Sequence, residues 1–361
     1  MTIKKVVVAG ATGLVGSAAL RHFGGIGGCN VVALSRRRPR DLHGAQFVAV
    51  DLADAAQCAA AAPALQDATH LVYAALYEKP NLVDGWRDEQ QIGINDRMLR
   101  NLMAVLEPAA PSLRHVALLQ GTKAYGVHVR PLTVPAREGR SEMYEQPNFY
   151  WAQENFLRDL QRGKRWHWSI LRPVLIVGLA MGGAMDLIPP LGVYAAMLRE
   201  QGRDLDYPGG AARVAQAVDV DLLARAIAWS GEADAARNEA FNVTNGDVFT
   251  WENIWPAIAG ALDMKPGRAV PLSLAKEYPK WIEPWDALRR RHDLASPALE
   301  EFVGLSFQYA DYSMRCGHTE SGPPSIVSTV KINQAGFTEM MDTEVMFRKW
   351  FAEARAKRLL P

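Results

Sequence analysis

The sequence predicts an α/β protein whose core is a doubly wound parallel sheet, joined to a smaller and mainly helical second part. Short apolar runs alternate with helix-like segments along the first half of the chain, and a glycine-rich turn follows the first run. Each apolar run is continuous rather than alternating with polar residues. Continuous runs are typical of parallel strands covered on both faces, and strand–helix alternation favours a doubly wound order.

Seven strands are expected, and helical segments separate the early ones. The strands cover residues 6–9, 31–35, 47–51, 70–75, 115–120, 168–171 and 241–244, and the helices cover residues 17–23, 55–65 and 90–106. Because the last strand lies far along the chain, the chain leaves the sheet and returns to it. We assign residues 1–178 to the sheet part, completed by about residues 214–248, and residues 179–213 and 249–361 to a helical part that shapes the substrate pocket.

The bulk composition excludes several classes of protein. The 361 residues include 40 Lys and Arg against 39 Asp and Glu, so no strong field attracts nucleic acid or an anionic membrane. The three cysteines form no CxxC pair and no His/Cys cluster has metal-ligand spacing, so we expect neither a disulfide framework nor a metal site. The first apolar stretch is too short for a signal peptide, and no window reaches the ~18 apolar residues of a membrane span. We therefore expect a cytoplasmic protein.

A glycine-rich turn joins the first strand to the first helix. Residues 10–16 read GATGLVG, a GxxGxxG spacing in which Gly10 makes the tight turn, Gly13 lets the backbone approach a pyrophosphate and Gly16 lets the helix pack on the strand. The N-terminus of the helix then faces the phosphate charge. The motif predicts a Rossmann-type dinucleotide site with contacts from Gly10, Thr12, Gly13, Leu14, Val15 and Gly16.

The end of the second strand indicates which dinucleotide binds. NAD-binding proteins usually place an acidic residue there, whereas residues 34–40 read LSRRRPR and contain none. Arg36 and Arg37, with Ser35 beside them, are placed to bind a 2′-phosphate through charge-assisted hydrogen bonds, which predicts NADPH as the cofactor. A solvated basic loop is the alternative. Asp51 is expected near the adenine ring or as a helix cap, and further cofactor contacts are expected from Leu52, Ala74, Ala75, Gln120, Tyr150, Pro173 and Ile176.

The catalytic candidates do not follow the usual dehydrogenase pattern. A Tyr-x-x-x-Lys pair on one helix is expected with this glycine motif, but the residue four positions after Tyr150 is Glu154. A lysine occurs upstream instead, at Lys123, just past the fifth strand, and the carboxyl ends of strands line the ligand crevice in this fold. We predict Tyr150 and Lys123 as the catalytic residues. Tyr125, two residues from Lys123, is a rival phenol that either shares the role or lines the pocket.

Four segments of the chain carry a specific resemblance. Residues 148–155 read NFYWAQEN, residues 121–125 GTKAY, residues 168–173 WSILRP and residues 238–249 NEAFNVTNGDVF. They resemble the motifs of the progesterone 5β-reductase and iridoid synthase family of atypical, extended short-chain dehydrogenases, in which the lysine has moved in the same way. The resemblance implies NADPH-dependent 1,4-reduction of the activated C=C bond of an enone or enal. By position, Tyr150 would donate to the carbonyl oxygen, and Lys123 would support that tyrosine or polarise the site.

The chain departs from the family pattern beside the reacting residue. The second tyrosine of the motif is Trp151, its acidic end is Glu154 followed by Asn155, and Leu76 stands where an aromatic pocket wall is expected. These differences concern the fit of the substrate more than the chemistry, so the substrate need not be a steroid or a monoterpene.

Three other functions are compatible with the glycine loop. They are an NADPH-dependent carbonyl reductase, a nucleotide-sugar epimerase or dehydratase, and a non-catalytic NADP-sensing protein. The missing Tyr-x-x-x-Lys pair and the arginine run disfavour the epimerase, and the joint presence of Tyr150 and Lys123 disfavours the sensor. The oligomeric state is open between monomer and homodimer.

Overall fold

The computed structural model describes residues 4–79, 86 and 88–361 and divides the chain into two compact units. Unit 1 comprises Met1–Val174, Val220–Val243 and Val327–Glu339, and unit 2 comprises Leu175–Asp219, Thr244–Ile326 and Met340–Pro361. The sequence assigned residues 327–339 to the helical part, whereas the structure groups them with the sheet. The reason is local, because the Lys331 ammonium donates to the Glu239 carboxylate at 2.6 Å and to the Ala240 carbonyl at 2.9 Å.

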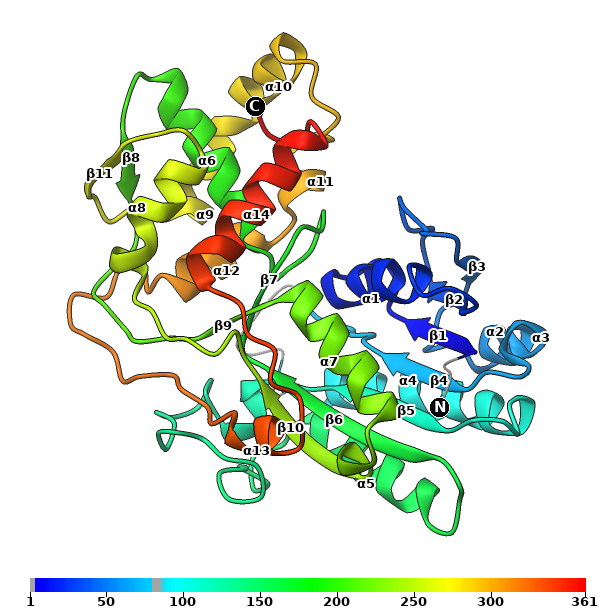
Figure 1. Ribbon diagram of the computed structural model, residues 1–361. Helices are drawn as coiled ribbons and strands as arrows, with labels where there is room; N and C mark the ends of the chain where they lie inside the picture. The colour runs from blue at the N-terminus through cyan, green and yellow to red at the C-terminus, as the bar shows by residue number, and fades with distance from the viewer. Residues whose placement is uncertain (1–3, 80–85, 87) are drawn as a thin grey trace. The chain divides into compact units, whose positions relative to one another are not determined.

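Unit 1 contains a seven-stranded parallel sheet in the order β10-β6-β5-β4-β1-β2-β3 (Figure 1). Its strands form from the apolar runs that the sequence singled out, and the predicted doubly wound parallel sheet is confirmed. The strands are β1 (Lys5–Ala9), β2 (Asn30–Ser35), β3 (Gln46–Ala49), β4 (His70–Tyr73), β5 (His115–Leu119), β6 (His167–Pro173) and β10 (Glu239–Val243).

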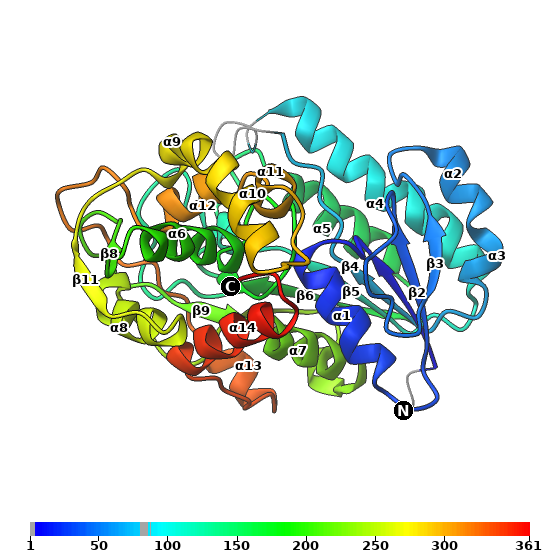
Figure 2. The same cartoon turned by 90° about the horizontal axis from the view of Figure 1, so that it is seen from above.

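Helices cover both faces of this sheet (Figure 2), which is why inner strands such as β1 and β4 are buried along almost their whole length. One face carries α1 (Leu14–Gly24) and α7 (Val220–Glu232). The other carries α2 (Ala55–Ala60), α3 (Ala62–Leu65), α4 (Glu89–Ala109) and α5 (Phe149–Gln161). The short α13 (Val330–Gln334) contacts β10.

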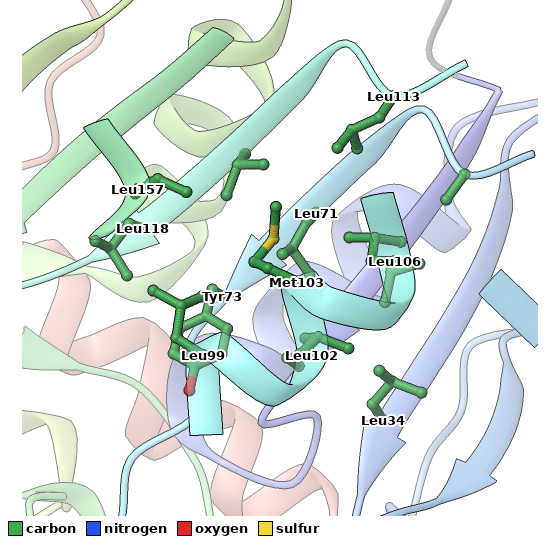
Figure 3. Packing of buried hydrophobic residues seen from close by; sticks show 14 of the residues in the cluster. Leu34, Leu71, Tyr73, Leu99, Leu102, Met103, Leu106, Leu113, Leu118 and Leu157 are labelled. Carbon is green, nitrogen blue, oxygen red and sulfur yellow. The ribbon is translucent and has the colours of Figure 1, made fainter. Parts of the chain in front are cut away.

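The main core of unit 1 lies between the sheet and α4 (Figure 3). Leu99, Leu102, Met103 and Leu106 recur every three or four residues along α4, so they share one face of the helix. This face packs on strand side chains such as Leu71, and all of these side chains are at most 1% exposed. The packing fixes the sheet whose strand ends carry the candidate site.

Three local features differ from the expected elements. The segment expected as one helix over residues 55–65 is split into α2 and α3, because Pro63 lies in the first turn of α3 and cannot continue an incoming helix. Strand β3 ends at Ala49, so Asp51 lies beyond it. Strand β4 ends at Tyr73, so Ala74 and Ala75 belong to the connection after the strand.

Unit 2 is mainly helical and contains two small sheets that the sequence did not predict. Strand β7 (Leu175–Val177) pairs with β9 (Ala217–Asp219), and β8 (Leu205–Tyr207) pairs with β11 (Pro266–Ala269). No helix in the described parts of the chain combines the length and apolar character needed to cross a bilayer. The helices are α6 (Ile188–Glu200), α8 (Trp251–Ala261), α9 (Leu274–Glu277), α10 (Ile282–Arg291), α11 (Leu299–Val303), α12 (Ser306–Ser313) and α14 (Thr343–Ala356).

A row of three histidines begins three neighbouring strands of the large sheet. His70 opens β4, His115 opens β5 and His167 opens β6, and the three are partners in register. His115 Nε2 lies 3.0 Å from Ser169 Oγ, which donates its own proton to the Ala236 carbonyl, so the imidazole is the donor to Ser169. Burial, assisted by the charges of His70 and His167, lowers the pKa of His115 to about 3.

This depressed pKa predicts a loss of stability in acid. The unfolded chain takes up a proton on His115 near pH 6.5, whereas the native protein does so only near pH 3, so stability falls as pH decreases between these values. As pH is lowered from 6.5 to 3, the unfolding free energy of wild type should fall by about 1.4 kcal/mol per pH unit more than that of His115→Gln, which lacks the imidazole. Urea unfolding at several pH values measures it. The same pH dependence of the unfolding free energy in wild type and His115→Gln would contradict the prediction.

Candidate functional site

The candidate site begins at the carboxyl ends of β1 and β4, which are neighbours although they are not consecutive strands. The strand order reverses at this point, and dinucleotides bind at such switch points in open α/β sheets. Gly10 leaves β1 with a φ of +85°, and a Cβ on it would lie 2.7 Å from the backbone of Ala74 and Ala75. Only glycine fits this turn, so Gly10 holds the loop against the end of β4.

The other two glycines of the loop have different roles. A Cβ on Gly16 would lie 2.1 Å from the Gly10 carbonyl oxygen, so Gly16 lets α1 pack on the turn. Gly13 is the N-cap of α1, is exposed and makes no side-chain cap, and the nearest atom to a Cβ there is 3.4 Å away. Thr12 is also exposed, and Leu14 and Val15 are partly buried in the first turn of α1. The loop therefore presents backbone N–H groups at a helix N-terminus, where a phosphate binds favourably.

The arginine run follows the carboxyl end of β2. Ser35 is buried and its hydroxyl donates to the Arg37 carbonyl at 2.7 Å, which shapes the loop. Arg36 and Arg37 are exposed, and neither pairs with a carboxylate among the described residues. Arg38 instead lies over the Phe47 ring, 5.7 Å from its centroid. The unpaired guanidinium groups of Arg36 and Arg37 thus lie at the strand end at which proteins with this fold bind the ribose of a dinucleotide.

The remaining predicted contacts lie at other strand ends. Asp51 Oδ1 accepts from the Ala53 N–H at 3.0 Å, so its carboxylate shapes a turn, and it is Asp54 that caps α2. Leu52 and Pro173 are buried, and Pro173 ends β6. Ile176 lies in β7 and therefore belongs to unit 2. The cofactor contacts expected of these residues stay predictions.

Lys123 lies in a 3-10 helix, Thr122–Tyr125, that follows β5 directly. Its ammonium sits over the Trp86 ring, 3.4 Å from the centroid. Burial lowers the pKa of Lys123 to about 7, although the charge of Glu78 acts in the opposite direction. An ammonium with this pKa loses its proton near neutral pH, which suits a group that takes part in proton chemistry.

Tyr150 lies in the first turn of α5, which Asn148 caps by accepting from the Tyr150 N–H at 3.0 Å. The side chain is 7% exposed, and its hydroxyl lies 3.4 Å from the position that a Cβ on Gly121 would take. Burial, assisted by the charge of Glu78 and opposed by that of Arg172, raises the pKa of Tyr150 well above its usual range. The phenol therefore stays protonated and acts as a hydrogen-bond donor.

The buried Arg172 guanidinium joins the strand ends to α5. Arg172 Nε donates to Gln120 Oε1 at 2.8 Å, and its other nitrogens pair with Glu142 at 2.5 Å and Glu154 at 3.3 Å. Gln120 donates in turn to Glu154 at 3.1 Å. The carboxamide of Gln120 is therefore engaged within the protein, and Glu154, which stands where a dehydrogenase lysine is expected, neutralises Arg172.

Tyr125 belongs to the same network. Its hydroxyl donates to Asn242 Oδ1 at 2.7 Å and accepts from Arg172 at 3.3 Å. Burial raises the pKa of Tyr125, although Arg172 opposes the shift. Because both partners are internal, the structure favours a structural role for this phenol and leaves Tyr150 as the phenol that contacts the same indole ring, Trp86, as Lys123 does.

The sequence reasoning missed two residues of the site. Trp86 and Glu78 contact each other, since Trp86 Nε1 donates to Glu78 Oε1 at 2.9 Å. Trp86 packs with Phe149 and Tyr150, whereas Leu76, expected to replace an aromatic wall, packs at the side of the same cluster. The signal that would have found them is weak: an aromatic and an acid between β4 and α4, where connections after strands carry ligand contacts.

A further cavity lies within unit 2. It has a volume of about 310 Å³ and is lined by Gly182, Gly183, Leu299, Glu300, Val303 and Phe307, among others. Its walls carry no phenol–lysine pair. Among the described residues, no three His, Cys, Asp or Glu side chains are grouped so that they could hold a metal ion.

The sheet order, the glycine turn and the strand-end residues define a protein with a Rossmann fold. A family model described as a PRISE-like Rossmann-fold domain matches residues 54–361, and the chain belongs to this family. An (S)-8-oxocitronellyl enol synthase of Nepeta cataria is 27% identical over 98% of this chain and 91% of its own length. A 3-oxo-Delta(4,5)-steroid 5-beta-reductase of Arabidopsis thaliana is 28% identical over 98% and 92%. The resemblance found in the motifs is thereby confirmed.

Solved structures share the fold at lower identity. A UDP-N-acetylglucosamine 4-epimerase from Methanobrevibacter ruminantium superposes with a TM-score of 0.67 at 16% identity, over 99% of this chain and all of that one. A short-chain dehydrogenase/reductase superfamily protein from Agrobacterium tumefaciens gives 0.65 at 15% identity, over 98% of each chain. At these identities the likeness concerns the fold alone.

The environment of Lys123 predicts a titration near neutral pH. The ammonium should lose its proton as pH rises through about 7, because burial favours the neutral amine. Side-chain NMR of lysine-labelled apoprotein measures this, with Lys123→Arg to assign the signal. A Lys123 signal that stays in its charged position up to pH 9 would contradict the prediction.

Proposed function

We propose that this protein is an NADPH-dependent reductase that performs 1,4-reduction of the activated C=C bond of an enone or enal. The observation that carries the proposal is that one buried indole, Trp86, contacts both the Lys123 ammonium and the Tyr150 ring at the carboxyl edge of a Rossmann sheet. The names of the family relatives, an 8-oxocitronellyl enol synthase and a steroid 5-beta-reductase, support the same reaction class.

Tyr150 supplies the electrophilic assistance. When a hydride adds to the β-carbon of an enone, negative charge develops on the carbonyl oxygen. A phenol that stays protonated can donate a hydrogen bond to that oxygen and stabilise the enolate in a site from which water is largely excluded. The α-carbon then takes a proton from solvent, so no second acid is needed.

Lys123 adds a positive charge near the same aromatic cluster. Its ammonium favours the developing enolate electrostatically, and this effect is larger in a buried site than in water. A lysine four residues after the tyrosine would lie beside Arg172, whereas a lysine after β5 does not disturb the buried ion pairs.

The residues at the carboxyl edge fit a dinucleotide with a 2′-phosphate. The loop of residues 10–16 would hold the pyrophosphate at the N-terminus of α1, and Arg36 with Arg37 would hold the 2′-phosphate. NADPH, when bound, supplies the hydride. The exposed arginines and the absence of an acid at this strand end favour NADPH over NADH.

The reaction is tested by NADPH oxidation at 340 nm with a panel of enones, from 2-cyclohexenone to progesterone. We expect turnover that falls about 100-fold in Tyr150→Phe, since removing one donor to a developing oxyanion costs that much. Tyr125→Phe should keep the rate within about 3-fold and lose ~1 kcal/mol of stability, because its hydroxyl serves Asn242 and Arg172. Turnover only with ketones that lack the C=C bond would instead indicate carbonyl reduction, and no turnover would reject the proposal.

The cofactor preference is tested by removing the exposed arginines. Arg36→Ala and Arg37→Ala should each raise KM for NADPH about 10-fold and leave KM for NADH nearly unchanged, because only NADPH carries the 2′-phosphate. Arg38→Ala, in the same loop but over Phe47, is the matched control for loss of positive charge. Equal effects of all three variants on both cofactors would reject the assignment.

A further inference from the structure

The Lys123 ammonium has an aromatic face as its neighbour instead of a carboxylate. Its Nζ lies 3.4 Å from the centroid of the Trp86 ring, and no hydrogen bond or ion pair of this Nζ occurs among the described residues. A desolvated ammonium over an indole gains cation–π energy that partly replaces its lost hydration. The contact with the indole therefore favours this position of the Lys123 ammonium.

Trp86 is itself fixed from three sides. It is 2% exposed, its Nε1–H donates to Glu78 Oε1 at 2.9 Å, and its ring meets Phe149 at 4.8 Å and Tyr150 edge-on at 5.4 Å between centroids. The hydrogen bond to a carboxylate increases the electron density of the indole, which strengthens its attraction for a cation. One ring therefore contacts both Lys123 and Tyr150.

Glu78 also acts on both catalytic groups through its charge. It raises the pKa of Lys123 against the effect of burial, and it adds to the burial that raises the pKa of Tyr150. Both effects favour the protonated forms. The charge of Arg172 acts in the opposite direction on Tyr150 and lowers its pKa.

We propose that Trp86 and Glu78 are positioning residues of this reductase: the indole holds the Lys123 ammonium beside Tyr150, and Glu78 holds and polarises the indole. The proposal rests on the proposed function for its effect on catalysis. The holding of Lys123 is a property of the unliganded protein and is tested separately. A Trp86 that merely fills space predicts that Trp86→Phe does not move the Lys123 titration.

The experiment compares wild type with Glu78→Gln, Trp86→Phe and the control Glu89→Gln, which removes an exposed charge from the first turn of α4. The Lys123 titration is followed by NMR in apoprotein, and kcat and KM are measured with NADPH and the best enone. We expect the Lys123 titration to move to lower pH in Glu78→Gln and Trp86→Phe. We expect kcat to fall about 5-fold in both, with KM for NADPH unchanged.

Glu89→Gln should leave the titration and kcat at wild-type values. An unchanged Lys123 titration in a folded Glu78→Gln protein would overturn the proposal. If Glu78→Gln fails to fold, Trp86→Phe decides by the same titration, because phenylalanine keeps an aromatic ring but lacks the N–H. A wild type without enone turnover would reject the proposed function, while the titrations would still decide whether Trp86 and Glu78 hold Lys123.

Discussion

A guanidinium that is 1% exposed must be neutralised inside the protein, and Arg172 imposes this requirement on the whole candidate site. Two carboxylates, Glu142 and Glu154, and the carboxamide of Gln120 surround it. These partners come from the end of β5, from α5 and from the segment that precedes α5. Arg172 therefore fixes the position of α5 relative to the strand ends, and with it the position of Tyr150 in the first turn of that helix.

The two ends of the large sheet serve different purposes. At the amino end, three histidines lie in register, and the two that are buried, His70 and His115, have internal hydrogen-bond partners. At the carboxyl end, Thr12 and Gly13 of the glycine loop and Arg36 and Arg37 of the arginine run are exposed, and among the described residues neither of these two arginines pairs with a carboxylate. Parallel strands place all carboxyl ends at one edge, so residues separated by more than a hundred positions in the sequence reach one crevice.

The sequence was sufficient for the parts of the structure that depend on local patterns. The continuous apolar runs predicted the sheet, and the turn at Gly10 and the motif around Tyr150 predicted a dinucleotide site and its catalytic residues. Trp86 and Glu78 could not be predicted in this way, because their importance arises from contacts with Lys123 and Tyr150, which are distant in sequence. The break at Pro63 was readable from the sequence but was outweighed by the alanine-rich pattern around it.

The internal role of Tyr125 was equally hidden, since it depends on Asn242, 117 residues away. The same is true of residues 327–339, whose place with the sheet depends on the contacts of Lys331 with Glu239 and Ala240 at the start of β10. Local sequence patterns contain no record of such pairings. They appear only when the fold brings the partners together.

The position of the lysine follows from the need to neutralise the buried Arg172 guanidinium. On α5, residue 154 lies one turn beyond Tyr150 and its side chain reaches Arg172. A lysine there would leave Arg172 with one carboxylate and place a second cation against it, which is strongly unfavourable in a buried site. A carboxylate at 154 therefore requires that the cation come from another element. The 3-10 helix after β5 supplies it at Lys123, whose ammonium lies over the Trp86 indole.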